Sequence, residues 1–185
     1  RNGGEGDWRN MFGAQLGAKY GDAFGIRNLF LQAEYNGARP YLYSHRDVIT
    51  NWGHYNQPLA HPWGANFEEF LVRAHYRYRR WFLEGAAHFG TLGRDAGNNE
   101  NFGNNIYKPN EERSVETGVF TGQGVAGEIR YYRAELSYLF NPIYNLRLQL
   151  GYRSRTETSA AGGFPNSEYI YFGLRTNVYD MYQDF

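Results

Sequence analysis

Apolar and polar residues alternate strictly along several segments of this chain, each about ten residues long. Between positions 70 and 78 every second residue is apolar or aromatic, and Arg73, His75 and Arg77 stand among the intervening residues. A period of two is typical of a β-strand whose two faces meet different surroundings. Segments with this pattern predict strands at 11–20, 27–36, 67–78, 81–91, 125–140, 146–157 and 168–179.

The predicted strands fit a membrane better than a water-soluble sandwich. Their length suits a strand that crosses a bilayer, aromatic residues gather at their ends, and polar loops separate them. Short connections at 21–26, 79–80 and 141–145 alternate with longer ones at 37–66, 92–124 and 158–167. Outer-membrane barrels have short periplasmic turns and long external loops. We therefore predict an all-β fold, an antiparallel transmembrane β-barrel in the bacterial outer membrane.

The composition agrees with a barrel. The chain has 17 Tyr, 13 Phe and 4 Trp, which suits aromatic girdles at both membrane interfaces, and no apolar run reaches the roughly 20 residues of a spanning helix. An Arg on the lipid side at the bilayer centre costs about 2–4 kcal/mol, so the Arg of the strands are expected to face the lumen. The predicted lumen charge ladder comprises Arg73, Arg77, Arg133, Arg147, Arg153, Arg155, Arg175, Glu69, Glu84, Glu135 and Glu157.

Two interpretations of this ladder are open. Its excess of positive charge could select anions such as acidic polysaccharide, because rings of Arg favour them. The interpretation that we prefer is cross-strand ion pairing that fills a narrow interior.

Other classes of function find little support. The formal net charge is zero, which is unlike the basic surface of a nucleic-acid-binding protein. Ser44, His45 and Asp47 are too close in sequence to aim three side chains at one reacting atom, so no enzyme is predicted. His54 and His61 lack a third ligand at metal-site spacing. We expect no metal and no cofactor.

The number of predicted strands bears on the extent of the domain. Bacterial barrels have an even number of strands, whereas this count is seven, and the sequence lacks the charged start and apolar core of a signal peptide. We therefore predict that 1–185 is the C-terminal part of a single, larger barrel domain. A complete eight-stranded barrel is the alternative. The terminal Phe185 resembles the aromatic end of a closing barrel strand, although its odd position requires a bulge or short tail.

The most distinctive segment is the loop His54-Tyr-Asn-Gln-Pro-Leu-Ala-His-Pro-Trp-Gly-Ala-Asn66. It resembles the Asn-x-Pro-Leu-x-His-Pro-x-Gly-Ala-Asn pattern of Wzi-like capsule-assembly outer-membrane β-barrels of the Bacteroidota, which include RemB-type relatives in gliding motility. Phe30-Leu-Gln-Ala-Glu-Tyr35 and Phe67-Glu-Glu-Phe70 stand where that family carries the flanking strands. The resemblance implies a non-catalytic outer-membrane protein that holds or organises capsular polysaccharide. Its implied partners are outer-membrane lipid and surface polysaccharide.

The same loop carries groups that suit sugars. Aromatic rings stack on pyranose faces, and neutral polar side chains donate and accept hydrogen bonds. The candidate carbohydrate-binding residues are Trp52, His54, Tyr55, Asn56, Gln57, His61, Trp63 and Asn66. In the alternative, which we favour, the loop is rigid and packs His61 and Trp63 inside the barrel mouth. Two other functions stay open: a gliding-motility or secretion-associated barrel that docks other envelope proteins, and a diffusion porin.

Overall fold

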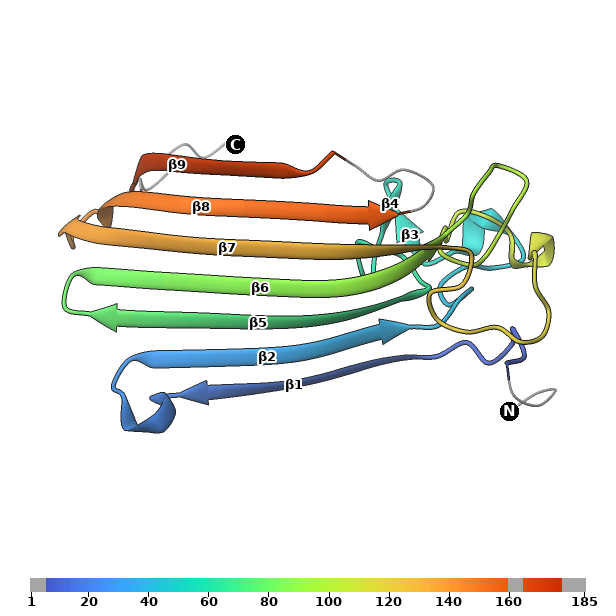
Figure 1. Ribbon diagram of the computed structural model, residues 1–185, viewed down its shortest axis with the longest axis horizontal. Coiled ribbons are helices and arrows are strands. Elements are labelled where there is room, and N and C mark those ends of the chain that lie inside the picture. The colour runs from blue at the N-terminus through green and yellow to red at the C-terminus, as the bar shows by residue number, and fades with distance from the viewer. Residues whose placement is uncertain (1–5, 160–164, 178–185) are drawn as a thin grey trace, which may run out of the picture.

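The computed structural model describes residues 6–159 and 165–177, and in this part of the chain every long element is a β-strand. Seven strands pair antiparallel in one sheet of order β1-β2-β5-β6-β7-β8-β9 (Figure 1). They are β1 (Gly13–Gly21), β2 (Leu29–Ala38), β5 (Phe67–Tyr78), β6 (Trp81–Arg94), β7 (Val125–Asn141), β8 (Leu146–Ser159) and β9 (Ser167–Arg175). The predicted all-β, antiparallel class is confirmed.

The strand bounds predicted from the sequence pattern agree with the observed bounds to within a few residues. The bounds of β5 are those predicted, and β6 continues three residues past its predicted end to Arg94. The predicted strand 168–179 ends earlier, at Arg175, and its last two residues lie outside the described part, as does the expected closing role of Phe185. Two short strands inside the loop 39–66 were not predicted: β3 (Gly53–His54) and β4 (Gln57–Pro58). They form a small separate hairpin.

The described sheet is open. β1 and β9 are its edges, each paired along one side with a single neighbour. An open edge exposes unpaired backbone groups, which a membrane does not tolerate. The seven described strands thus form an antiparallel sheet that does not close on itself.

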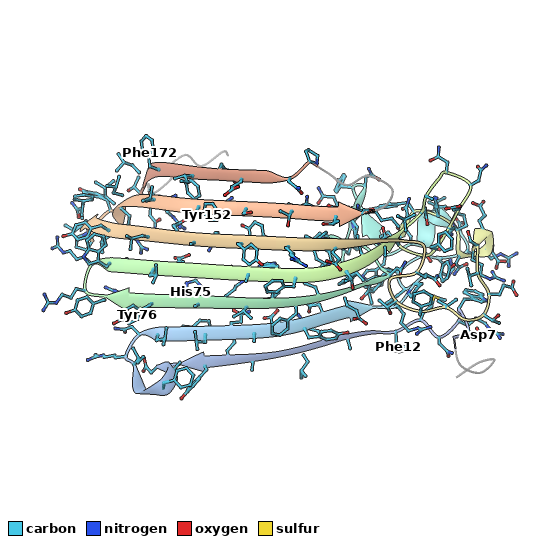
Figure 2. The ribbon with its side chains drawn as sticks, in the orientation of Figure 1. Asp7, Phe12, His75, Tyr76, Tyr152 and Phe172 are labelled. Atoms are coloured by element: carbon cyan, nitrogen blue, oxygen red, sulfur yellow. The ribbon has the colours of Figure 1, made fainter. Side chains whose placement is uncertain are left out.

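The pairing register separates the side chains of the sheet into two faces of different chemistry. Leu83 of β6 lies opposite Tyr76 and Leu136, whereas the next residue, Glu84, lies opposite His75 and Glu135. The adjacent residues His75 and Tyr76, labelled in Figure 2, thus belong to opposite faces. We name these the polar face, which carries Glu84, and the apolar face, which carries Leu83.

Large hydrophobic side chains of the apolar face are exposed, and their aromatic members form two rows. Near the long loops the row comprises Tyr35, Phe70, Phe89 and Tyr132, and near the short turns it comprises Tyr78, Trp81, Tyr138 and Phe140. Within these rows the Phe89 and Tyr132 rings are 5.7 Å apart, and the Trp81 and Tyr138 rings are 4.8 Å apart. Smaller apolar residues such as Val72, Ala87 and Ala134 lie between the rows.

The short turns lie at one end of the sheet and the long loops at the other (Figure 1). The first turn contains the 3-10 helix η1 (Ala23–Gly25), and the loops contain η2 (Val48–Thr50) and η3 (Asn110–Glu112). We call the segments 6–12, 39–66 and 95–124 together the cap. Hydrogen bonds tie the three segments to one another: Trp8 N–H donates to the Glu116 carbonyl at 3.1 Å, and Tyr41 N–H donates to the Gly103 carbonyl at 2.9 Å.

The cap covers the polar face at the loop end of the sheet. The buried core of the molecule lies there, and its strand members belong to the polar face, as the direct pairing of Ala38 with Phe67 and of Phe67 with Leu92 shows. From the cap, Leu42, Tyr43, Trp63 and Ala65 pack against them. The apolar contacts of this core hold the cap on the sheet, because burying an apolar side chain contributes about 1.5–3 kcal/mol.

Candidate glycan-binding cap and charged face

Asn66 joins the loops of the cap. Its side chain is fully buried, and its amide nitrogen donates to the carbonyls of Gly93 at 3.0 Å and Gln123 at 2.9 Å. Its amide oxygen accepts from the Gly122 N–H at 2.7 Å. The backbone at Asn66 is left-handed, with φ 58°, a conformation that Asn adopts more readily than most residues. Because the amide is buried and bonded at both its nitrogen and its oxygen, Asn66 has no free polar group with which to contact a sugar.

His61 and Trp63 also pack inward. The His61 ring stacks on Phe67 at 4.2 Å between centroids, and the Trp63 ring meets the same Phe67 edge-on at 5.6 Å. The side-chain amide of Asn104, on the other long loop, donates to the Trp63 carbonyl at 2.9 Å. This packing matches the arrangement in which the loop is rigid and folded inward. His61 and Trp63 therefore serve the cap core.

A buried carboxylate connects the cap to the strands. Glu69 of β5 lies between His61 of the cap, at 3.2 Å, and His88 of β6, at 3.4 Å. The amide of Asn36 on β2 donates to the same carboxylate at 3.2 Å. His88 and Asn36 are not among the residues singled out from the sequence, although both have the strand parity of the polar face. One carboxylate thus holds a loop and two neighbouring strands.

The remaining candidate sugar-binding residues stand out in solvent. Trp52 precedes the β3–β4 hairpin, and His54, Tyr55, Asn56 and Gln57 form its tip. Tyr55 is 88% exposed, and the His54 and Tyr55 rings lie 4.3 Å apart. Tyr55 and Asn56 have φ 48° and 58°, the left-handed values that a two-residue hairpin turn requires. For a Tyr this backbone conformation costs about 1 kcal/mol, so the exposed Tyr55 ring stands on a locally strained turn.

The second long loop is held by internal contacts. Lys108 forms an ion pair with Asp95 at 2.6 Å, and the Phe102 N–H donates to the same carboxylate at 2.7 Å. Tyr41 is fully buried beneath this loop and donates its hydroxyl proton to the Asn101 carbonyl at 2.9 Å. Burial raises the pKa of the Tyr41 hydroxyl. The first carboxylate of the segment 95–100 is thus neutralised by Lys108.

The serine, histidine and aspartate of 44–47 are not aligned for proton transfer. The Ser44 hydroxyl donates to the Tyr41 carbonyl at 2.7 Å, and His45 Nδ1 lies 2.6 Å from the Thr50 hydroxyl. The Asp47 carboxylate accepts from the Ile49 N–H at 3.0 Å and caps η2. Each side chain serves the local turn.

The register places all members of the lumen charge ladder on the polar face. Some of them pair: Arg133 with Glu84 at 3.0 Å, and Arg155 with Glu157 at 2.6 Å. Glu157 also pairs with Arg94, a residue that the ladder did not include. Glu135 accepts instead from the Tyr171 hydroxyl at 2.6 Å.

Several Arg of the ladder contact aromatic rings or have no ion-pair partner. The Arg147 guanidinium lies 3.8 Å from the centroid of Phe82, and Arg153 lies 5.2 Å from that of Tyr171. Within 6–159 and 165–177, Arg73 and Arg175 have no carboxylate at ion-pair distance. The polar face therefore combines ion pairs with uncompensated positive charge.

No helix in the described chain is both long enough and apolar enough to cross a membrane. In the same residues, no three His, Asp or Glu side chains are grouped so as to hold a metal ion. Comparisons with protein-family models, with curated proteins and with solved structures found no match for this chain.

Proposed function

We propose that this chain is part of a bacterial outer-membrane β-barrel that holds or organises surface polysaccharide without catalysis. The apolar face carries the membrane part of this proposal. A sheet of seven strands with exposed Leu16, Leu83 and Phe172 on one face would aggregate in water, whereas lipid covers such a face. Aromatic rows at both ends of an apolar band are the arrangement found at membrane interfaces.

Closure of the sheet follows from the same proposal. In lipid every backbone N–H and C=O needs a partner, so the free edges of β1 and β9 require further strand pairing. Strands of a longer chain, or direct pairing of the two edges, would supply it. The cap then lies in the mouth of the barrel on the side of the long loops, which in outer-membrane barrels faces outward.

The exposed hairpin tip is the observation that carries the polysaccharide part. Tyr55 and Trp52 offer solvent-exposed rings at 88% and 58%, beside the polar side chains of His54, Asn56 and Gln57. Flat apolar rings next to neutral donors and acceptors match the two sides of a pyranose. The hairpin is anchored below by Trp52 N–H, which donates to the Tyr43 carbonyl at 2.9 Å. A rigid base under an exposed aromatic tip suits an extended ligand such as a glycan chain.

The test has two parts on native cells. The intact protein is extracted from outer membranes with detergent, and its mass and its retained glycan are measured. Cells that carry Tyr55→Ala or Trp52→Ala in the full-length protein are expected to retain less surface polysaccharide with unchanged amounts of protein in the membrane. The control is Phe24→Ala, since Phe24 is also an exposed aromatic, at 77%, with a left-handed φ of 58°, but lies in the short turn. Recovery in a soluble fraction, or equal glycan on all cells, would overturn the proposal.

One observation favours docking of an envelope protein as a second function. Ile49 and Leu59, which flank the hairpin in the sequence, are 89% and 60% exposed, and aliphatic side chains of this kind suit a protein surface better than a sugar. In that case Ile49→Ser would abolish co-purification of a partner, while Tyr55→Ala would leave surface glycan unchanged.

A further inference from the structure

The polar face holds an open cavity that no part of the cap fills. It has a volume of ≈ 530 Å³ and is lined by residues of four adjacent strands, β6 to β9. The polar members of its lining are Glu84, Arg133, Glu135, Gln149, Arg153, Arg175 and Thr176. The cavity therefore lies away from the hairpin tip.

The charges around this cavity are unbalanced. Three guanidinium groups face two carboxylates, and both carboxylates are already engaged: Glu84 with Arg133 at 3.0 Å, and Glu135 with the Tyr171 hydroxyl at 2.6 Å. Arg133 of β7 and Arg153 of β8 lie directly opposite each other in the strand register. Like charges directly opposite in a sheet repel each other. An anion between them would relieve that repulsion.

Unused hydrogen-bonding atoms around the cavity define the ligand further. Within the described chain, Arg133 Nε and Arg153 Nε are buried donors without an acceptor, and Gln149 Oε1 is a buried acceptor without a donor. A carboxylate satisfies the guanidinium donors, because the two groups match as planar forks. A neighbouring hydroxyl group satisfies the Gln149 oxygen. A sugar acid carries both groups on one ring.

An aromatic surface lies beside the same Arg. The Tyr171 ring covers Gly151, where a Cβ atom would lie 2.2 Å from the ring, and Arg153 lies 5.2 Å from the Tyr171 centroid. The Arg153 side chain also donates to the Tyr169 hydroxyl at 3.4 Å. These contacts keep Arg153 in place, so its charge is preorganised for a ligand.

We propose that this cavity binds carboxylate-bearing sugars, that is, uronic-acid-type units of an acidic polysaccharide. The proposal rests on the proposed function and deepens it, because it names the chemical class of the glycan. The cavity is a second subsite, separate from the Trp52 and Tyr55 tip, and its ligand lies within the barrel rather than above it.

The experiment is calorimetric titration of the full chain in detergent micelles with three probes: tri-galacturonate, neutral galactotriose and inorganic phosphate. Tri-galacturonate is expected to bind, and its affinity to fall with added salt. Arg153→Gln and Arg175→Gln should each weaken it at least roughly tenfold, since hydrogen bonds to charged groups are worth that much. Arg153→Lys, which keeps the charge and loses the fork, should fall between the wild type and Arg153→Gln.

The matched control is Arg130→Gln, on the same strand as Arg133 but on the opposite face, where Arg130 pairs with Glu128 at 3.3 Å. Equal binding of phosphate and tri-galacturonate would reduce the cavity to a general anion site, such as one for lipid phosphate, and overturn the sugar-acid assignment. Absence of tri-galacturonate binding, or a loss in Tyr55→Ala and not in Arg153→Gln, would also overturn it. In this last case the proposed function would stand with the hairpin as the glycan site. Circular dichroism of each variant verifies that it has folded.

Discussion

Trp63 of the cap lies directly over Gly90 of β6: a Cβ atom at position 90 would stand 2.3 Å from the Trp63 ring. The sheet needs a glycine there because the loop reaches down to its polar face. The contact fixes the depth at which the cap sits, and it joins the most distinctive sequence segment to the wall of the proposed barrel.

Gly90→Ala is expected to push Trp63 out of its place and destabilise the cap by about 1–3 kcal/mol, the usual cost of overpacking. Hydrogen exchange of the segment 54–66 would measure the loss. Gly85→Ala on the same strand is the control, because the nearest atom to a Cβ there is 4.0 Å away. Equal exchange in the two variants would mean that Trp63 does not rest on Gly90.

Asn66→Gly separates the role of the amide from that of the backbone, since glycine tolerates the left-handed φ of 58°. Loss of the amide leaves the carbonyls of Gly93 and Gln123 without this donor, and we expect the free energy of opening the cap to fall by about 1–3 kcal/mol. Asn56→Gly is the matched control, with the same φ of 58° but an exposed side chain. A similar effect of both substitutions would contradict the joining role of Asn66.

Glu69→Gln removes the charge between His61 and His88 and leaves a group that can still accept from Asn36. The cap is expected to lose about 1–3 kcal/mol of stability, because charge-assisted hydrogen bonds are stronger than neutral ones. Faster proteolysis of the loop 54–66 would show this loss of stability. Glu68→Gln, at the exposed neighbouring position, should change nothing. Unaltered proteolysis in Glu69→Gln would show that the carboxylate does not hold the cap.

Leu83→Arg places a charge on the apolar face between the two aromatic rows and is expected to cost up to about 2–4 kcal/mol when the chain folds into lipid vesicles. His75→Arg serves as the control, because its side chain lies on the polar face, where the His75 ring is 3.9 Å from Glu84. Urea titration of the vesicle-inserted protein measures both. If both variants insert equally well, the apolar face does not contact lipid.

The contact between Asp7 and Arg9, in the first segment of the cap, is expected to depend on pH. Hydrogen bonds from the Arg9 side chain and backbone lower the pKa of Asp7 from 3.8 to about 2. Because the folded pKa is depressed, the contact stabilises the segment fully above pH 3.8 and is lost as the pH falls through about 2. The amide resonance of Arg9, whose N–H donates to Asp7 at 2.9 Å, should therefore titrate near pH 2. Asp7→Asn should abolish this titration, and a wild-type midpoint near pH 4 would contradict the assignment.

The strands and the composition of their two faces were accessible from sequence because both depend on local chemistry. The period of two sets which side chains share a face, and Leu83 and Glu84 follow from it without knowledge of their neighbours. The positions of the turns followed in the same way. The hairpin β3–β4 escaped prediction because its strands are two residues long and have no period.

The candidate sugar-binding residues fall into an exposed group and a packed group, and the difference depends on contacts between distant segments. Trp52, Tyr55, His61, Trp63 and Asn66 look alike as candidate sugar ligands in the sequence. Only the fold shows that the first two are exposed and the last three serve the cap.

The sequence by itself thus determined an antiparallel sheet with one apolar and one charged face, since alternation is a property of neighbouring residues. The tertiary structure alone decided which charges meet. Glu69 pairs with His61 and His88 rather than with an Arg, and Arg133 comes to lie opposite Arg153. Those contacts depend on strand register and on the path of the loops, which arise from long-range packing and are not encoded in any local pattern.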